Sequence, residues 1–225
     1  MAYYLVISSS RHLFICSALL ILVAARPARG QDPPPKIGPF VVDVHGTVPS
    51  FPQEEPLAAS RELALAELPG HGFGAQVAAT VYFLRWRAVT VGIGGEVAAG
   101  RAHNTPPPPA TADAIPLRPV EERFRSAGSQ LSFNFGNGNG WSYISGGIGQ
   151  STWSVIPDGG TAVPSDVAHL KTINYGGGAR WFDKKHVAFS FDVRFYAINP
   201  GPPNLADPGG PRTTLLVIGA GVSLK

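Results

Sequence analysis

The sequence predicts an all-β fold, an eight-stranded antiparallel up-and-down transmembrane β-barrel, from its proline positions, its side-chain alternation and its choice of polar residues. The chain has 225 residues and 22 prolines. Proline cannot donate to a β-ladder, so long segments without proline indicate where a sheet lies. The windows in question are 40-48, 70-105, 120-156, 165-199 and 212-225. Three of them have room for a hairpin and two for one strand, which gives eight strands.

Residues 1-30 have the pattern of a secretory signal peptide. Arg11 precedes an apolar run over 13-25, and small residues follow it, which predicts cleavage near Gly30/Gln31. The apolar run is shorter than the roughly twenty residues that a membrane-spanning helix needs. After cleavage, two parts of the chain are expected to remain. The first is a proline-rich lead at 31-37, and the second is the outer-membrane barrel at 38-225.

Loss of the signal peptide changes the charge of the chain. The full sequence has 18 basic and 15 acidic residues. The first thirty residues contain three arginines and no acid, so the mature chain balances 15 basic against 15 acidic residues. A neutral chain gives no support for nucleic-acid binding. The single cysteine, Cys16, is also removed, so no disulfide framework is expected.

The first three strands alternate apolar with small or polar side chains, the period of two expected of a strand with unlike faces. They are expected at 40-48, about 72-86 and about 89-100. Asp43 and His45 lie on the polar face of the first, between valines, and Glu96 lies on the polar face of the third. A tight turn near 85-88 joins the second to the third.

Strands four and five are expected at about 125-136 and 141-154. Leu131 and the phenylalanines after it alternate with polar residues in strand four, and Asn137-Gly138-Asn139-Gly140 is a strong hairpin signal. In strand five, Trp141 favours one register and Ile144 the other. A one-residue change in the turn exchanges the two faces of a strand, so the facing of strand five stays open.

The last three strands are expected at about 169-181, 187-197 and 216-224. Strand seven has the clearest alternation, with Val187 and five further apolar residues at odd positions opposite Asp192 and Arg194. Strand six carries Arg180 on its polar face, and a turn at 183-185 connects the two.

The polar faces distinguish a membrane barrel from a soluble one. They contain mainly glycine, serine, threonine, asparagine and glutamine, whereas a water-facing surface is usually rich in charged residues. The apolar face is therefore expected to meet lipid, and the polar face to line the lumen. Aromatics near strand ends predict interfacial girdles: Phe40, Phe83, Trp86, Trp141, Trp153, Trp181 and Phe182.

Short and long connections alternate along the chain. The three short turns share a side with both chain ends and are expected to be periplasmic. The four long loops, at about 49-71, 102-124, 155-168 and 199-212, should face outward. The first of them has a stretch, Ala58 to Leu68, that predicts a short helix.

With this pattern over about 38-225, the chain resembles the eight-stranded outer-membrane barrels, the group that includes the transmembrane domain of outer membrane protein A. The runs Val187 to Ala197 and Leu131 to Phe135 carry the resemblance. It implies the cell outer membrane as location, with the lipid bilayer and the barrel assembly machinery as partners. Such barrels commonly end in an aromatic residue, whereas this sequence stops at Leu224-Lys225. The terminal signal is therefore either relaxed or absent from this sequence.

Six charged or titratable residues are expected to meet in the lumen: Asp43, His45, Glu96, Arg180, Asp192 and Arg194. The interior of an eight-stranded barrel is just wide enough for side chains to fill. Isolated buried charges are costly, so these groups are expected to pair. The prediction is a plugged, hydrogen-bonded lumen, with a small pore or transport barrel as the alternative.

The sequence predicts no catalytic, cofactor-binding or metal-binding residues. Lipid A deacylases of similar shape carry a histidine two residues before a serine, and no His-x-Ser occurs here. The glycine runs lie in strands and are not followed by a helix, unlike phosphate loops. The expected function is non-enzymatic, a monomer with a structural or surface-interaction role that binds an unknown extracellular partner through its long loops. A soluble exported lipocalin-like binder of a hydrophobic ligand is a further alternative.

Overall fold

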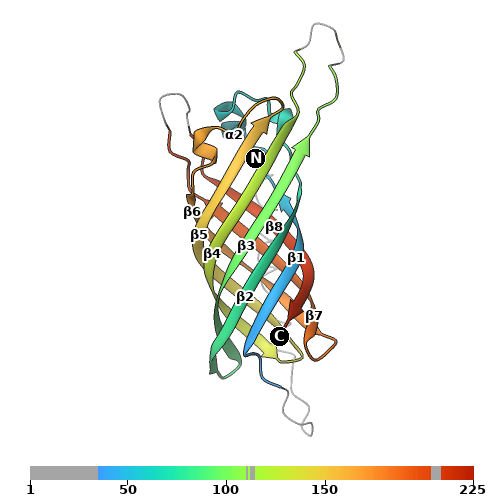
Figure 1. Cartoon of the computed structure of the whole chain (residues 1–225), viewed down its shortest axis with the longest axis vertical. Helices are drawn as coiled ribbons and strands as arrows, with labels where there is room; N and C mark the ends of the chain where they lie inside the picture. Colours follow the sequence, from blue (N-terminus) through green and yellow to red (C-terminus); the bar gives the residue numbers. More distant parts are fainter. Residues whose placement is uncertain (1–34, 110, 112–114, 204–208) are drawn as a thin grey trace, which may run out of the picture. The chain divides into compact units, whose positions relative to one another are not determined.

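The computed structural model describes residues 35–109, 111, 115–203 and 209–225. Eight strands form one closed antiparallel barrel in chain order, and β1 pairs with β8 to close it (Figure 1). This confirms the predicted fold class. The expected signal peptide, its cleavage site and residues 31-34 of the lead lie outside the described residues. Among the described residues, no helix has the length and apolar content needed to cross a membrane.

The strands are β1 Phe40–Ser50, β2 Phe73–Trp86, β3 Val89–Asn104, β4 Val120–Asn137, β5 Gly140–Pro157, β6 Leu170–Phe182, β7 Val187–Ile198 and β8 Thr213–Leu224. Strands β1, β3, β4, β5 and β8 run further than predicted at the long-loop end. The segment before residue 125, expected to be loop, pairs with both β3 and β5. Its charged residues alternate in and out like the rest of β4, so pairing continues past the apolar part of the strand. Proline exclusion also misses Pro49, which lies at the end of β1.

The two faces of the wall differ as predicted. Asp43 and His45 of β1 are buried inside the barrel, whereas Val44 and Val48 of the same strand are exposed outside. The same alternation runs through β7, where Asp192 is buried and the phenylalanines point outward. A β-bulge near Tyr82 in β2 turns Phe83 and Leu84 outward together.

The turn between β4 and β5 settles the facing of β5. Asn137 pairs with Gly140 across a two-residue turn, which places odd-numbered residues of β5 inside. Trp141 is therefore buried in the lumen and Ile144 is exposed. The girdle prediction is wrong for Trp141 and for Trp153, which are only 3% and 7% exposed. The other girdle candidates near strand ends, apart from the half-buried Phe182, are exposed: Phe40, Phe83, Trp86 and Trp181.

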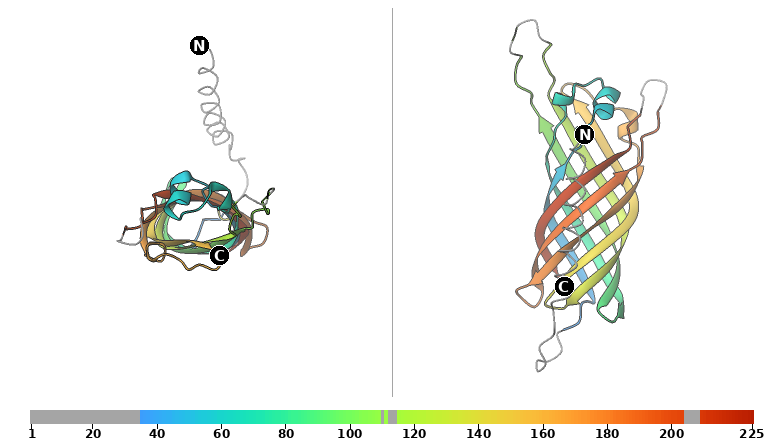
Figure 2. Two further views of the ribbon diagram at one scale, coloured as in Figure 1. Left: turned by 90° about the horizontal axis from the view of Figure 1, so that it is seen from above. Right: turned by 180° about the vertical axis from the view of Figure 1, so that it is seen from behind.

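The expected helix over Ala58 to Leu68 is wrong in its bounds. The structure has a short α-helix, α2 Glu55–Ser60, and a 3-10 turn, η1 Leu65–Glu67. Helix α2 ends because Glu62 takes a left-handed conformation, with φ 53°, and the chain turns back there. The segment lies over one end of the barrel (Figure 2).

Candidate functional site

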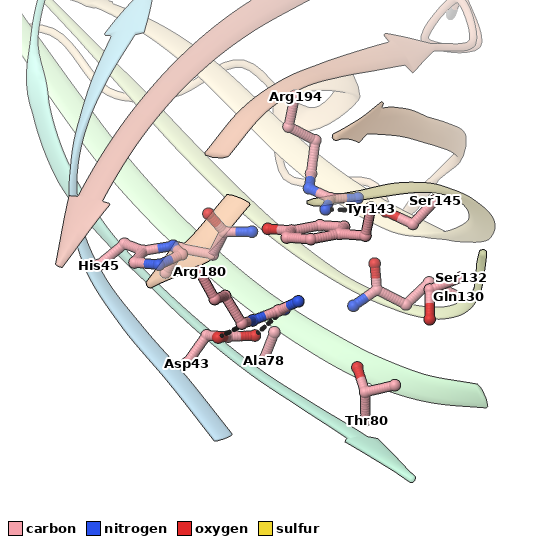
Figure 3. Close-up of a pocket in the computed structure, with 11 residues that line it drawn as sticks. Asp43, His45, Ala78, Thr80, Gln130, Ser132, Tyr143, Ser145, Arg180 and Arg194 are labelled. Carbon is pink, nitrogen blue, oxygen red and sulfur yellow. Dashed lines mark hydrogen bonds and ion pairs between the residues drawn. The ribbon is translucent and has the colours of Figure 1, made fainter. Parts of the chain in front are cut away.

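A pair of opposite charges from β1 and β6 crosses the middle of the lumen. The Arg180 guanidinium donates from Nε and Nη2 to the two carboxylate oxygens of Asp43, at 2.8 and 2.6 Å. Ser223 of β8 donates to the same carboxylate at 2.5 Å. This bidentate geometry is the strongest that an arginine and a carboxylate form. Figure 3 shows the Asp43–Arg180 pair, and with Ser223 three strands are joined across the barrel interior.

A second cluster surrounds Arg194 of β7. Its guanidinium contacts the carboxylates of Asp192 and Glu96 at 3.1 Å, and donates to the Ser145 hydroxyl at 3.0 Å. Gln76 of β2 donates to Glu96 at 2.9 Å. One arginine thus faces two acids, and four strands contribute to the cluster.

Tyr143 of β5 connects the two clusters. Its hydroxyl donates to Asp192 at 2.6 Å, and the Arg180 guanidinium lies 4.0 Å from the centre of its ring. A ring below a guanidinium is attracted electrostatically, most strongly where water is excluded. Tyr143 therefore belongs to the site, although sequence reasoning missed it because the facing of β5 was open.

Five of the six predicted lumen residues form ion pairs, and His45 does not. His45 Nε2 lies 2.8 Å from the hydroxyl of Ser190 on β7. The cavity that both clusters line has a volume of only about 10 Å³. That is room for about one water molecule.

Aromatic rings fill the lumen at the short-turn end. Trp141 stacks on Phe182 with ring centres 4.9 Å apart, and meets Tyr82 edge-on at 6.0 Å. The Lys225 ammonium group lies 3.8 Å from the Phe182 ring centre and donates to the carbonyl of Gly138. The inner end of the lumen is therefore occupied as well as its middle.

The outer end of the lumen holds an apolar core that sequence analysis did not predict. The segment between β1 and β2, residues 51–72, is called the lid below. The lid buries Phe51, Leu57, Leu63 and Leu68 against inward-facing residues of the long strands. Those partners include Phe124, Trp153, Tyr196, Ile198 and Leu215. A loop that packs into the barrel was not expected, because the sequence shows only an alternation of apolar and charged residues there.

Ion pairs hold the lid to other loops. Arg61 of the lid forms a buried ion pair with Asp166, which lies in the 3-10 turn η2 Pro164–Asp166, and its Nη1 donates to Gly209 at 3.0 Å. Asp166 also accepts from the backbone NH of Val155 at 3.0 Å. These contacts join the lid to the segments before β6 and β8.

Glu67 forms a second tie, to the segment before β4. Its carboxylate accepts from the backbone NH groups of Arg118, at 2.5 Å, and Ala64, at 2.6 Å. Burial alone would raise the pKa of Glu67. These backbone hydrogen bonds and the Arg118 guanidinium outweigh burial and hold its pKa below the ordinary value of 4.5.

One buried acid lies apart from the ion pairs. Glu122 of β4 is fully buried and accepts from the indole NH of Trp153 at 2.8 Å. It was missed because residues before 125 were expected to be loop; the alternation of β4, extended backward, would have placed it inside.

Among the described residues, no group of three or more histidine, cysteine, aspartate or glutamate side chains is placed to hold a metal ion.

Comparison with known proteins identifies the fold. No protein-family model matches the chain, and no curated protein sequence matches it. Among solved structures, the chain is similar to the crystal structure of Neisserial surface protein A, with a TM-score of 0.52 and 14% sequence identity. The match covers 84% of this chain and 97% of that one. At this identity the likeness shows a shared eight-stranded barrel fold and nothing further.

Proposed function

We propose that the chain is a monomeric, non-enzymatic β-barrel of the cell outer membrane with a plugged lumen. Its role is envelope structure or surface interaction through the long loops. The observation that carries this proposal is the polarity of the wall, with large apolar side chains outside and a filled, hydrogen-bonded interior. Export by the expected signal peptide and insertion by the barrel assembly machinery complete the proposal.

The outer surface supports a lipid environment. Exposed apolar residues occur on all eight strands, among them Val44, Val77, Ile93, Leu131, Ile148, Ile173, Phe189 and Ile218. A soluble protein rarely exposes a contiguous apolar surface of this extent. A lipocalin-like binder would have the opposite polarity, with an apolar interior around its ligand. Because the barrel is closed, no strand edge is left unpaired. A barrel in lipid needs this, because the hydrocarbon layer cannot satisfy free backbone groups.

The filled lumen favours a plug over a pore. Aromatic rings occupy the inner end, two ion-pair clusters the middle, and the lid the outer end. A pore would need all three layers to open together. The long loops then remain as the surface available to an extracellular partner, which is unidentified.

Two measurements test the proposal. Closed membrane barrels resist unfolding in detergent, so unboiled and boiled protein should migrate differently in an electrophoretic gel, and the protein should fractionate with outer membranes. Equal mobility combined with recovery in the soluble fraction would contradict membrane insertion. Liposomes containing the protein should not swell in a small-sugar solution, whereas swelling would favour the transport alternative.

A further inference from the structure

Three arginines gather on the outer face of the wall, near the long-loop ends of β3 and β4. The sheet register sets Arg101 directly opposite Arg123, and Ala99 opposite Arg125. Phe73 of β2 pairs with Arg101 from the other side. Odd-numbered residues of these strands point outward, so all three guanidinium groups and the Phe73 ring share one surface, called the arginine surface below.

One of the three arginines forms an ion pair, and Arg101 acts on the same carboxylate, Glu121, only through a longer-range electrostatic interaction. Arg123 donates from Nε and Nη2 to the two carboxylate oxygens of Glu121, each at 2.9 Å. Among the described residues, Arg101 and Arg125 form no ion pair. The arginine surface and Glu121 together therefore carry a charge of plus two. All three arginines are exposed, so their guanidinium groups are available to an anion.

The wall is hollowed beside these charges. A groove of about 480 Å³ runs past the three arginines, and its floor includes Gly74, Ala75, Ala99 and Gly100. Of these, Ala75 and Ala99 stand at outward positions, where other residues of the same strands are valine or isoleucine, and their small side chains leave space. Phe73 lies at the edge of this groove with 80% of its surface exposed, the most exposed aromatic ring among the large apolar residues of the wall. The groove is thus lined by cationic arginine side chains and by an apolar region made of Phe73 and the small floor residues.

The height of the arginine surface matches a lipid headgroup layer. Ten residues separate the outward-facing Val91 from Arg101 on β3, and ten separate Phe135 from Arg125 on β4. A tilted strand crosses the hydrocarbon layer in about nine to eleven residues. With Val91 and Phe135 near the inner boundary, the arginines stand at the outer boundary, where lipid phosphates lie.

We propose that the arginine surface binds the phosphate groups of a phosphorylated lipid in the outer leaflet. The planar fork of arginine matches the oxygens of a phosphate, and weakly hydrated guanidinium groups suit an interface. Phe73 and the groove floor contact the first part of an acyl chain. The inference rests on the proposed function for the membrane and for the orientation with long loops outward.

The test is a binding titration of the purified full chain, folded in detergent micelles, with diphosphorylated lipid A, dephosphorylated lipid A and inorganic phosphate as probes. The double variant R101Q/R125Q removes both unpaired charges. The matched control is R85Q/R87Q, which removes two exposed arginines at the short-turn end of the barrel, one near the end of β2 and one in the turn that follows it.

Wild type and R85Q/R87Q should bind diphosphorylated lipid A equally, and R101Q/R125Q should bind it at least about tenfold more weakly. Dephosphorylated lipid A should bind wild type as weakly as the double variant binds the phosphorylated form. Equal affinity of R101Q/R125Q and wild type would overturn the inference, as would an equal loss in the control. Full competition by inorganic phosphate at equal concentration would also overturn it, because the site would then recognise the free anion.

Gel mobility before and after boiling shows whether each variant is a folded barrel. If wild type forms no heat-modifiable, membrane-inserted barrel, the proposed function fails. If it does, and phosphorylated lipid shows no preference for the arginine surface, this inference fails alone.

Discussion

At the scale of single residues, the lumen depends on buried charges that pair with one another. Asp43 and Arg180 are each about 3–4% exposed, and each satisfies the other at two points. Removing one member of such a pair leaves an uncompensated buried charge, whereas removing both does not. The energetic cost of a single change therefore differs from that of the double change.

The variant D43A should lower the free energy of unfolding by about 3–5 kcal/mol, because Arg180 is left buried without a carboxylate. The double variant D43A/R180A should cost less than the sum of the two single changes. Urea unfolding in lipid vesicles, followed by gel mobility, measures each value. The control E121Q breaks an exposed pair and should leave the midpoint unchanged. Strict additivity of the two lumen changes would refute a direct interaction.

Tyr143 offers a milder test of the same lumen. The variant Y143F keeps the ring below Arg180 and removes the hydroxyl that donates to Asp192. We expect a loss of about 1.5–3 kcal/mol, the net value of a hydrogen bond to a charged group, because Asp192 keeps its contact with Arg194. The same urea titration applies. Y175F, on the outward face of β6, serves as the control and should unfold like wild type.

At the scale of elements, the lid is a separate layer on a barrel that does not need it for closure. Its apolar side chains pack on the strand ends, and its charged side chains reach the other loops. The lid can therefore open while the ladder of strands stays intact. Substitutions in the lid should therefore change how well the lid resists protease and hydrogen exchange, and should leave the barrel folded.

The variant L68A should destabilise the closed lid by about 2–5 kcal/mol, the usual cost of truncating a fully buried leucine. Trypsin should then cleave after Arg61, which is buried in the wild type. The control L65A alters an exposed leucine of the same segment and should resist trypsin like wild type. If L68A stays uncleaved after Arg61 at protease levels that cut an unfolded lid, the packed lid is refuted.

Glu67 gives the lid a dependence on pH. Because its pKa in the folded lid lies below 4.5, the carboxylate contributes full stability above that pH and loses it as the pH falls through the lowered pKa. Protection factors of lid amides from hydrogen exchange should therefore decline in acid. In the variant E67Q, the protection factors of the lid amides should already be lower at neutral pH, and they should decline less in acid. An identical decline in E67Q would assign the acid effect to another group.

Elements also differ in how far the sequence could predict them. A period of two gives the facing of β1 and β7, where polar and apolar residues alternate without exception near Asp43 and Asp192. It fails for β5, because Trp141 and Ile144 are both apolar and the turn decides between them. It cannot find the lid, whose burial depends on contacts between residues as distant as Leu57 and Leu215. Tyr143 was missed because the facing of β5 was open, and Glu122 was missed because residues before 125 were expected to be loop.

At the scale of the whole molecule, the barrel combines an apolar exterior with an interior that side chains occupy at three levels, which is the basis of the proposed plug. Aromatic stacking at Trp141, ion pairs at Arg180 and Arg194, and apolar packing at Leu68 follow one another along the lumen. Each layer uses a different interaction. No single substitution is therefore expected to open a continuous path.

The most direct test of this account is single-channel recording in planar bilayers with the purified, heat-modifiable protein, using a general porin as positive control. The proposed plugged lumen predicts a flat baseline, without stable conductance steps, over sustained recording at moderate voltage. Stable, large conductance steps from the wild-type protein would contradict the plugged lumen and favour a pore.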